Sequence, residues 1–239
     1  MAGIELQRAG YALGGKAILS DLSADLRERR IGILGRNGSG KTTLLRLIAG
    51  LIAPTSGQVR VEGADPWRDR KGMLGRLGIL FQNPDHQILF PTCEEELAFG
   101  LRQQGTPQEQ ALAQARQALA EAGRAHWSQA AVSTLSGGQR HWLCLQSVLL
   151  MQPATILLDE PFAGLDLPTI ARMTRRLESL PQRLITITHD PAAVAGADRV
   201  LWLDQGRIRA DGPPGKVVPG FIAEMARIGE VDADSDLAG

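Results

Sequence analysis

The stretch Gly35-Arg36-Asn37-Gly38-Ser39-Gly40-Lys41-Thr42 decides the fold. It follows the short apolar run 31–34, which predicts a buried strand, and it leads into residues 42–49, which we expect to form a helix ending at Gly50. Glycines let backbone N–H groups curl around an anion, and the start of a helix adds the positive end of its dipole. The stretch matches the pattern G-x-x-x-x-G-K-[ST] in the strand–loop–helix setting that this pattern needs. A glycine-rich turn with a chance lysine is the alternative, which the flanking elements disfavour.

This loop supplies the first candidate site residues. We expect its backbone to cradle the phosphates of a nucleotide, Lys41 to reach the β- and γ-phosphates, and the hydroxyl of Thr42 to bind Mg²⁺. The candidate nucleotide-binding residues here are Gly35, Asn37, Gly38, Ser39, Gly40, Lys41, Thr42 and Thr43.

An acidic pair follows a second apolar run. Residues 155–158 predict a strand, and Asp159 and Glu160 come directly after its apolar part. Open α/β sheets bind ligands at the carboxyl ends of their strands. We therefore expect Asp159 to hold Mg²⁺ and Glu160 to act as the general base that polarises an attacking water. Two adjacent acids can instead cap the next turn, but their presence beside a phosphate loop favours the catalytic interpretation.

A third motif, Leu135-Ser136-Gly137-Gly138-Gln139, discriminates between families. Alone, a Ser-Gly-Gly turn carries little information. Together with the two motifs above, it resembles the signature sequence of ABC (ATP-binding cassette) ATPases. The resemblance implies that Ser136, Gly137, Gly138 and Gln139 bind the γ-phosphate of ATP, through a hydroxyl and N–H groups at a helix start.

The resemblance extends over residues 2–220 and assigns four further positions. Gln82 matches the loop glutamine that senses Mg²⁺ and the attacking water, and Asp166 lies in the loop that crosses to a partner subunit. His189 follows a predicted strand and matches the switch histidine that contacts the γ-phosphate. Tyr11 lies where this family stacks an aromatic ring on adenine, although a place in the core is the alternative for Tyr11.

The predicted elements alternate between strands and helices, which indicates an α/β fold with a largely parallel sheet. The resemblance implies a P-loop NTPase (ABC ATPase) core with an antiparallel N-terminal β region and an inserted α-helical subdomain. We expect the nucleotide-binding domain to span residues 1–220, with the helical subdomain at about 83–150. Residues 221–239 are expected to form a C-terminal helix and an acidic tail that is partly disordered.

One helix of the insertion has clear predicted ends. Thr106-Pro107-Gln108-Glu109 predicts a capping box with proline at the first helical position, and Gly123 predicts the end of this helix. Three departures from the family pattern stand elsewhere: Phe162 where Thr or Ser is common, the pair His141-Trp142 after the signature, and Leu167 inserted before Pro168. None of them removes a catalytic group.

Composition restricts the partners. Lys and Arg number 26 and Asp and Glu number 26, so the formal net charge is zero, which argues against nucleic acid as the main partner. Cys93 and Cys144 show neither metal-ligand nor disulfide spacing and fit a reducing cytosol. We see no signal peptide and no uncharged apolar run of the ~18 residues that span a bilayer. We therefore expect a peripheral protein on the cytoplasmic face of the cell membrane.

The family resemblance also implies the assembly. In ABC ATPases the signature of one subunit faces the phosphate loop of another, so this chain is expected to pair head to tail with itself or with a related ATPase. Residues 82–92, followed by Glu94-Glu95-Glu96, resemble the energy-coupling factor (ECF) branch, which energises importers of vitamins and transition metals. This branch implies a transmembrane coupling protein and a substrate-binding membrane protein as partners. The three glutamates would suit arginines of the coupling protein; a solvated acidic helix start is the alternative.

Biotin is the favoured cargo, ahead of cobalt or nickel, because the chain ends soon after its core. Three other functions stay open. A soluble ABC ATPase in DNA repair or translation is disfavoured by the absence of sustained heptads and of a second cassette. A module that binds ATP without hydrolysing it is disfavoured by Glu160 and His189. The ATPase of a conventional ABC importer or exporter is disfavoured only by residues 83–96.

Overall fold

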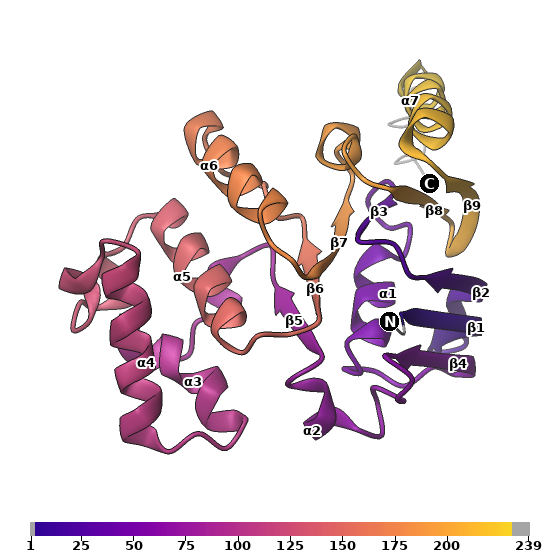
Figure 1. Cartoon of the computed structure of the whole chain (residues 1–239). Coiled ribbons are helices and arrows are strands. Elements are labelled where there is room, and N and C mark those ends of the chain that lie inside the picture. The colour runs from indigo at the N-terminus through magenta and orange to yellow at the C-terminus, as the bar shows by residue number, and fades with distance from the viewer. Residues whose placement is uncertain (1–2, 231–239) are drawn as a thin grey trace.

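The computed structural model describes residues 3–230, and the described part divides into a two-sheet α/β core and a helical lobe (Figure 1). The expectation of a disordered acidic tail falls largely on residues 231–239, which lie outside the described residues. No helix within residues 3–230 is long and apolar enough to cross a membrane.

The central sheet has six strands in the order β5-β6-β7-β3-β8-β9, and all neighbours are parallel except β8 and β9. Its inner strands are apolar runs that are buried on both faces, as parallel sheets require. The mostly parallel sheet is therefore confirmed. The strands are β3 (Arg30–Leu34), β5 (Leu77–Leu80), β6 (Thr155–Asp159), β7 (Arg183–Thr188), β8 (Arg199–Asp204) and β9 (Arg207–Gly212).

A second, antiparallel sheet in the order β2-β1-β4 forms the N-terminal β region. Its strands are β1 (Ile4–Leu13), β2 (Lys16–Leu26) and β4 (Ser56–Val61). Helix α1 (Lys41–Ile48) packs its buried leucines and Ile48 into the core that the two sheets share. This core fixes the phosphate loop, because α1 is the helix that the loop opens.

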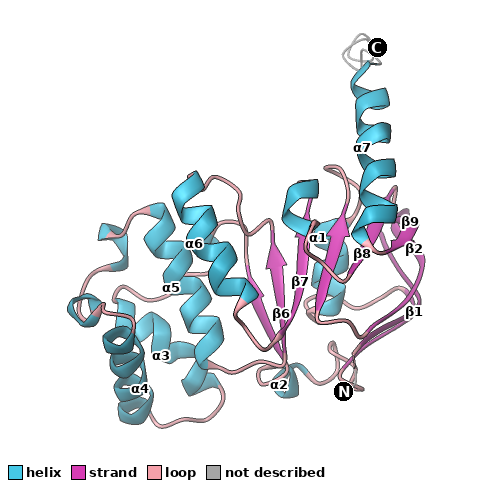
Figure 2. Ribbon diagram, turned by 45° about the horizontal axis from the view of Figure 1, so that its top comes forward, coloured by secondary structure: helices cyan, strands magenta, loops and turns pink. Residues whose placement is uncertain are grey.

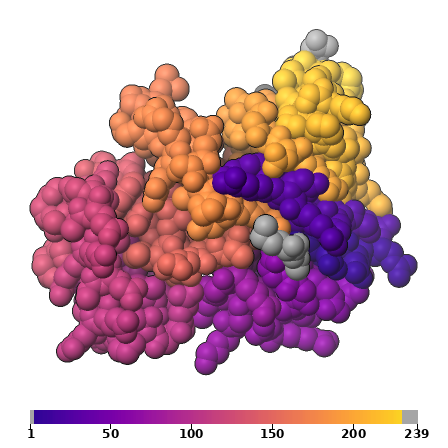
Figure 3. Space-filling view, in the orientation of Figure 1, coloured from indigo at the N-terminus to yellow at the C-terminus, as the bar shows by residue number. Residues whose placement is uncertain are grey.

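Helices α3 (Cys93–Gln103), α4 (Gln108–Glu121) and α5 (Gly137–Leu150) form the helical lobe, which has its own apolar cluster. Figure 3 shows this lobe on the side of the molecule opposite the N-terminal strands. The predicted capping box at Thr106 is wrong. Pro107 keeps an extended ψ of 146°, so α4 begins one residue later and has no side-chain cap.

The remaining helices flank the sheet (Figure 2). Helix α6 (Leu167–Glu178) follows β6, α7 (Pro214–Glu230) packs on β8 through Val217 and Phe221, and α2 (Arg70–Met73) is a single turn. Short 3-10 turns lie at η1 (Pro84–His86), η2 (Ala125–Trp127), η3 (Val132–Thr134) and η4 (Pro191–Val194).

Candidate active site

The phosphate loop joins β3 to α1 and has a backbone that only glycine accommodates easily. Gly38 and Gly40 have φ angles of +78° and +101°. A Cβ atom at Gly35 would lie 2.5 Å from the carbonyl oxygen of Leu203 and 2.6 Å from Oγ of Ser39. The loop therefore packs closely against the end of β8, which leaves no room for a side chain at Gly35. Its N–H groups can turn toward a ligand.

Lys41 lies buried across the mouth of this loop. Its Nζ donates to the carbonyl oxygens of Gly35 at 2.6 Å and Arg36 at 3.1 Å, and it lies 3.9 Å from Oε1 of Glu160. Burial lowers the pKa of Lys41, against the charges of Glu160 and Asp159. A phosphate oxygen would be a stronger partner for this ammonium than the two carbonyl groups that hold it.

Glu160 and His189 meet at the carboxyl ends of two adjacent parallel strands, β6 and β7. Oε1 of Glu160 accepts a hydrogen bond from the backbone N–H of His189 at 2.9 Å and lies 2.8 Å from its Nδ1. Oε2 accepts from the hydroxyl of Thr188 at 2.8 Å. Glu160 has a left-handed φ of 45°, which costs a non-glycine residue about 1 kcal/mol. Such strain at a site residue is typical of functional positions.

A pocket of about 310 Å³ brings these groups together. Most of the predicted loop residues line it, with Gln82, Asp159, Glu160 and, from β2, Ile18. Burial, and next the charge of Glu160, raise the pKa of Asp159. Asp159 and Glu160 repel each other, and the single ammonium of Lys41 offsets only part of their charge. A cation such as Mg²⁺ would therefore be bound favourably here, with Thr42 and Gln82 as further oxygen donors. Residues 3–230 contain no cluster of three or more His, Cys, Asp or Glu side chains that could hold a metal ion.

Tyr11 does not line this pocket. It lies on β1 opposite Leu19, half-buried, and packs against the main core. Ile18 lines the pocket instead, and its carbonyl oxygen would be 3.3 Å from a Cβ at Gly40. The sequence offered no signal for Ile18, because it reaches the loop through the packing of β2 against α1 and the turn before β9. Stacking of Tyr11 on adenine stays a prediction.

The signature begins α5. Ser136 and Gln139 form a capping box: the Ser136 N–H donates to Oε1 of Gln139 at 2.7 Å, and the Gln139 N–H donates to Oγ of Ser136. Asp166 caps the neighbouring helix α6 by accepting from the N–H of Thr169 at 2.9 Å, and a Cβ at Gly138 would lie 3.1 Å from Thr169. None of the signature residues lines the phosphate-loop pocket of the same chain. Within one chain the phosphate loop and the acidic pair thus meet in one pocket, whereas the signature lies at the start of α5, outside that pocket.

Two glutamates of the acidic triplet at the start of α3, Glu94 and Glu96, are buried and therefore offer no docking surface. Glu94 is buried and accepts from Nε and Nη2 of Arg116 at 2.9 and 3.0 Å, and also from Ser128 and Gln129. These bonds hold the pKa of Glu94 at about 2, with the Arg116 bond as the largest cause.

Glu96 is also buried, and its Oε2 accepts the N–H groups of Leu89 at 2.8 Å and Phe90 at 3.0 Å. Both interpretations, arginine docking and a solvated helix start, are therefore wrong for Glu94 and Glu96. The physical reason is that the turn before α3 and the segment after α4 fold over the first turn of α3, and their donors need acceptors there.

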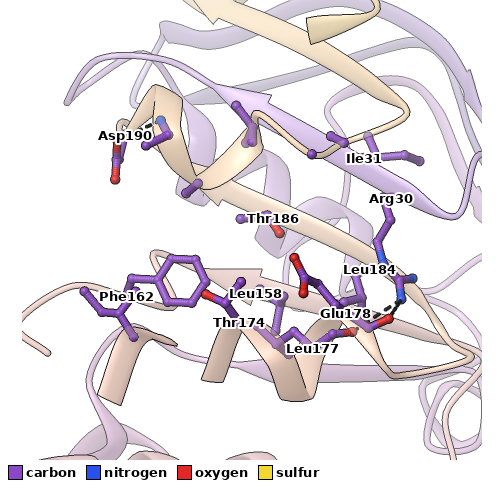
Figure 4. A pocket seen from close by; sticks show the side chains of 16 residues that line it. Arg30, Ile31, Leu158, Phe162, Thr174, Leu177, Glu178, Leu184, Thr186 and Asp190 are labelled. Carbon is purple, nitrogen blue, oxygen red and sulfur yellow. Dashed lines mark hydrogen bonds between the residues drawn. The ribbon is translucent and has the colours of Figure 1, made fainter. Parts of the chain in front are cut away.

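Phe162 lines a separate cavity of about 270 Å³ behind the catalytic strands (Figure 4). Figure 4 shows its ring beside Leu158, with Asp190 on the facing turn and Arg30 at the far end, where Arg30 donates to the carbonyl of Glu178. The aromatic ring thus fills space next to the loop after Glu160 and takes no place in the nucleotide pocket.

Comparisons with known proteins agree with this geometry. The family model described as ABC transporter matches residues 19–163. The chain is 50% identical over 233 residues to the biotin transport ATP-binding protein BioM of Rhodobacter capsulatus, covering 98% of this chain and 100% of that protein. It is 36% identical to the energy-coupling factor transporter ATP-binding protein EcfA1 of Ligilactobacillus salivarius, covering 85% of this chain and 74% of the relative.

Among solved structures, cbiO1 of Clostridium perfringens, described as part of the ABC transporter complex cbiONQ, superposes with a TM-score of 0.77. The two sequences are 26% identical, and the match covers 97% of this chain and 96% of that chain. Motifs, fold and relatives agree: the chain belongs to the ABC transporter family, as an ATP-hydrolysing subunit of the energy-coupling factor type.

Proposed function

We propose that this chain hydrolyses ATP with Mg²⁺ to energise an ECF-type importer, and that biotin is its cargo. One observation supports the hydrolytic part: Lys41, Asp159 and Glu160 line one pocket, and His189, at the end of the neighbouring strand β7, contacts Glu160 without lining that pocket. The cargo assignment is supported by the 50% identity to a biotin transport ATP-binding protein. Cobalt or nickel is the second candidate, because the structural neighbour belongs to a cbiONQ complex.

The mechanism follows from the groups in the pocket. The loop N–H groups and Lys41 hold the phosphates in place, and Thr42, Asp159 and Gln82 would hold Mg²⁺, which neutralises charge on the β- and γ-phosphates. Oε1 or Oε2 of Glu160 orients a water and takes its proton as the water oxygen bonds to the γ-phosphorus. The bond to the bridging oxygen breaks, and ADP and inorganic phosphate result. The N–H and ring of His189 contact Glu160 and hold its rotamer, and the ring is the group that would contact the γ-phosphate.

Two copies, or this chain and a related ATPase, would complete the sites head to tail. The signature residues Ser136, Gly137 and Gln139 are exposed at the start of α5 and lie outside the chain's own pocket. A second phosphate loop with its ATP can therefore approach this helix start, where N–H groups and the helix dipole favour an anion. Asp166 and the exposed Leu167 stand next to it at the start of α6.

We infer that a membrane partner contacts the chain at the groove between η1 and the turn before α5. Asp85, Ile88, Phe90 and Arg140 line this groove, and Leu89 next to it is 65% exposed. A transmembrane coupling protein seated there would hold the chain at the cytoplasmic face of the membrane, together with a substrate-binding membrane protein. The charged residues Asp85 and Arg140 pair with each other at 3.2 Å and give the groove polar anchors.

The first test compares ATP turnover of the native chain with Glu160→Gln, using Glu109→Gln on the exposed face of α4 as the matched control. Loss of the general base should lower turnover at least about a hundredfold while ATP still binds. Equal turnover in Glu160→Gln and the control would refute the assigned chemistry.

The second test addresses the cargo. The chain would be purified from gently solubilised membranes and reconstituted with the membrane proteins that accompany it. Uptake of labelled biotin, but not of cobalt or nickel, is expected. Recovery of a soluble complex only would refute the role in transport and leave the ATPase chemistry standing.

A further inference from the structure

One side chain joins the strand end that carries Gln82 to the helix that begins at the signature. Gln87 is half-buried and directly follows the turn η1. Its Oε1 accepts the N–H of Phe81 at 3.2 Å, and its Nε2 donates to the carbonyl oxygen of Cys144 at 3.3 Å. Phe81 directly follows β5, and Cys144 lies in the middle of α5. The amide of Gln87 therefore bridges two elements that carry different parts of the proposed ATP site.

The turn η1 returns the chain so that this bridge can form. The side chain of Asn83 caps the turn by accepting the N–H of Asp85 at 2.9 Å. The N–H of Gln87 then donates to the carbonyl oxygen of Pro84 at 2.9 Å, which brings Gln87 back to Phe81, six positions earlier. Because β5 is an edge strand, an N–H just beyond its end that does not face β6 has no ladder partner, and the Gln87 amide supplies one.

The chemistry of the two partners suits a glutamine side chain. An N–H needs an acceptor and a carbonyl oxygen needs a donor, and a primary amide offers both from one planar group. A carboxylate in place of Gln87 would keep the acceptor for Phe81 but would set a second acceptor against the carbonyl of Cys144. An apolar side chain of the same length would satisfy neither partner. The two halves of the bridge can therefore be removed together or one at a time.

Further contacts fix the same segment on α5. Asp85 pairs with Arg140 at 3.2 Å, and Sγ of Cys144 lies 3.9 Å from the carbonyl oxygen of Pro84. Arg140 and Cys144 are four residues apart and so lie on one face of α5. The segment after Gln82 is therefore held against the signature helix at two levels, one helical turn apart.

The place of Gln82 depends on these contacts. Its side chain lines the phosphate-loop pocket with Asp159 and Glu160, yet the residue itself is exposed and comes two positions after an edge strand. The bond from Gln87 to Phe81 acts on the backbone next to Gln82. A shift of about 1 Å in a group of an active site can cost about a hundredfold in rate, so a fixed backbone at this point matters for turnover.

We propose that Gln87 is a positioning residue of the ATPase reaction, which holds Gln82 in the nucleotide pocket by tying the end of β5 to α5. The inference rests on the proposed function, because it is there that Gln82 is given a role in hydrolysis. Gln87 is not among the residues that line the nucleotide pocket. Its effect is therefore expected on turnover and not on the affinity for ATP, which the phosphate loop supplies.

The first measurement is steady-state ATP hydrolysis by the full chain. Gln87→Met keeps the length of the side chain and removes both bonds, so kcat should fall about tenfold while KM for ATP changes less than about twofold. Gln87→Glu keeps the acceptor for Phe81 and loses the donor to α5, and it should still lower kcat at least about threefold. Gln110→Met, at an exposed position of α4, is the matched control and should keep the native kcat and KM.

A double-mutant cycle then shows whether Gln87 acts through Gln82. Gln82→Ala should lower kcat by itself, and Gln87→Met in the Gln82→Ala chain should lower it no further. Amide hydrogen exchange gives a readout that does not depend on turnover. The N–H of Phe81 should exchange at least about tenfold faster in Gln87→Met than in the native chain, whereas the amides of β6 keep their native rates.

Three results would overturn the proposal. One is a native kcat in Gln87→Met, and another is an equal fold-loss of kcat on Gln87→Met in the native and Gln82→Ala chains. The third is a raised KM with an unchanged kcat, because Gln87 would then act on nucleotide binding. Native turnover in Gln87→Met together with lost turnover in Glu160→Gln would leave the proposed function standing, so the two failures can be told apart.

Discussion

Replacing Glu94 by glutamine tests whether the acidic start of α3 is a structural clamp or a docking surface. The carboxylate accepts from Arg116, Ser128 and Gln129, residues that lie 22, 34 and 35 positions further along the chain. Glu94→Gln keeps the shape of the side chain, removes its charge, and turns an NH₂ group toward donors. The loop after α4 then loses the acceptor that ties it to α3.

The magnitude follows from the titration of Glu94. Its pKa falls from 4.5 to about 2 in the folded chain. That difference corresponds to at most about 3.5 kcal/mol of folding free energy, because each pKa unit is worth about 1.4 kcal/mol. Arg116 is 55% exposed, so solvent screens part of the interaction, and we expect a loss of about 1–2 kcal/mol.

The assay is urea unfolding of the native chain, Glu94→Gln and the neighbouring control Glu95→Gln across pH. A carboxyl group with a lowered folded pKa stabilises fully above its unfolded pKa and loses that contribution as pH falls toward its folded pKa. The gap between native and Glu94→Gln chains should therefore be largest near neutral pH and narrow below about pH 4.5. A Glu94→Gln chain as stable as the native one at pH 7, yet unable to bind its membrane partner, would refute the clamp.

Three further outcomes are expected. Gly50→Ala should lower the free energy of unfolding by at least about 2 kcal/mol. Gly50 has a φ of +67°, and a Cβ there would lie 2.1 Å from the carbonyl oxygen of Pro66. An unchanged midpoint of thermal unfolding would contradict this. Leu167→Ala should leave that midpoint unchanged, since the residue is 81% exposed, and should weaken ATP-dependent dimerisation in sedimentation runs; equal dimer affinity would remove Leu167 from the interface. Cys93 and Cys144 should resist a thiol reagent at pH 8 until urea is added, because both are buried and burial raises the pKa of Cys144 to about 12. Fast labelling of the folded chain would contradict this and show that the helical lobe opens.

The elements around the nucleotide pocket were predictable because their signals are local. Gly38 and Gly40 permit the positive φ angles of the loop, Lys41 opens the helix, and apolar runs mark β3, β6 and β7 to within a residue or two. Such features depend on a few neighbouring residues, and the motif order identified the family. The comparisons confirm that identification.

The misplaced features depend on contacts between distant segments. Glu94 and Glu96 look like a solvated helix start until the turns around residues 89–90 and 128–129 fold over them. Ile18 reaches the phosphate loop because β2 packs against α1 and the turn before β9, and the pairing of β1 with β2 places Tyr11 opposite the core residue Leu19. A short window of sequence does not show which carboxylate will be buried under a distant segment of the chain.

The sequence by itself predicted the chemistry and determined the fold class, through a glycine-rich loop with Lys41, an acid pair after a buried strand, and a signature that resembles that of ABC ATPases. Only the tertiary structure decided which groups meet. The order β6-β7-β3 places Glu160 against His189 and within 3.9 Å of Lys41, since parallel strands bring their carboxyl ends to one edge. Folding likewise brings Arg124, next to η2, to one cavity with Arg172 and Arg176 of α6, because side chains far apart in sequence share a surface only after the chain has folded.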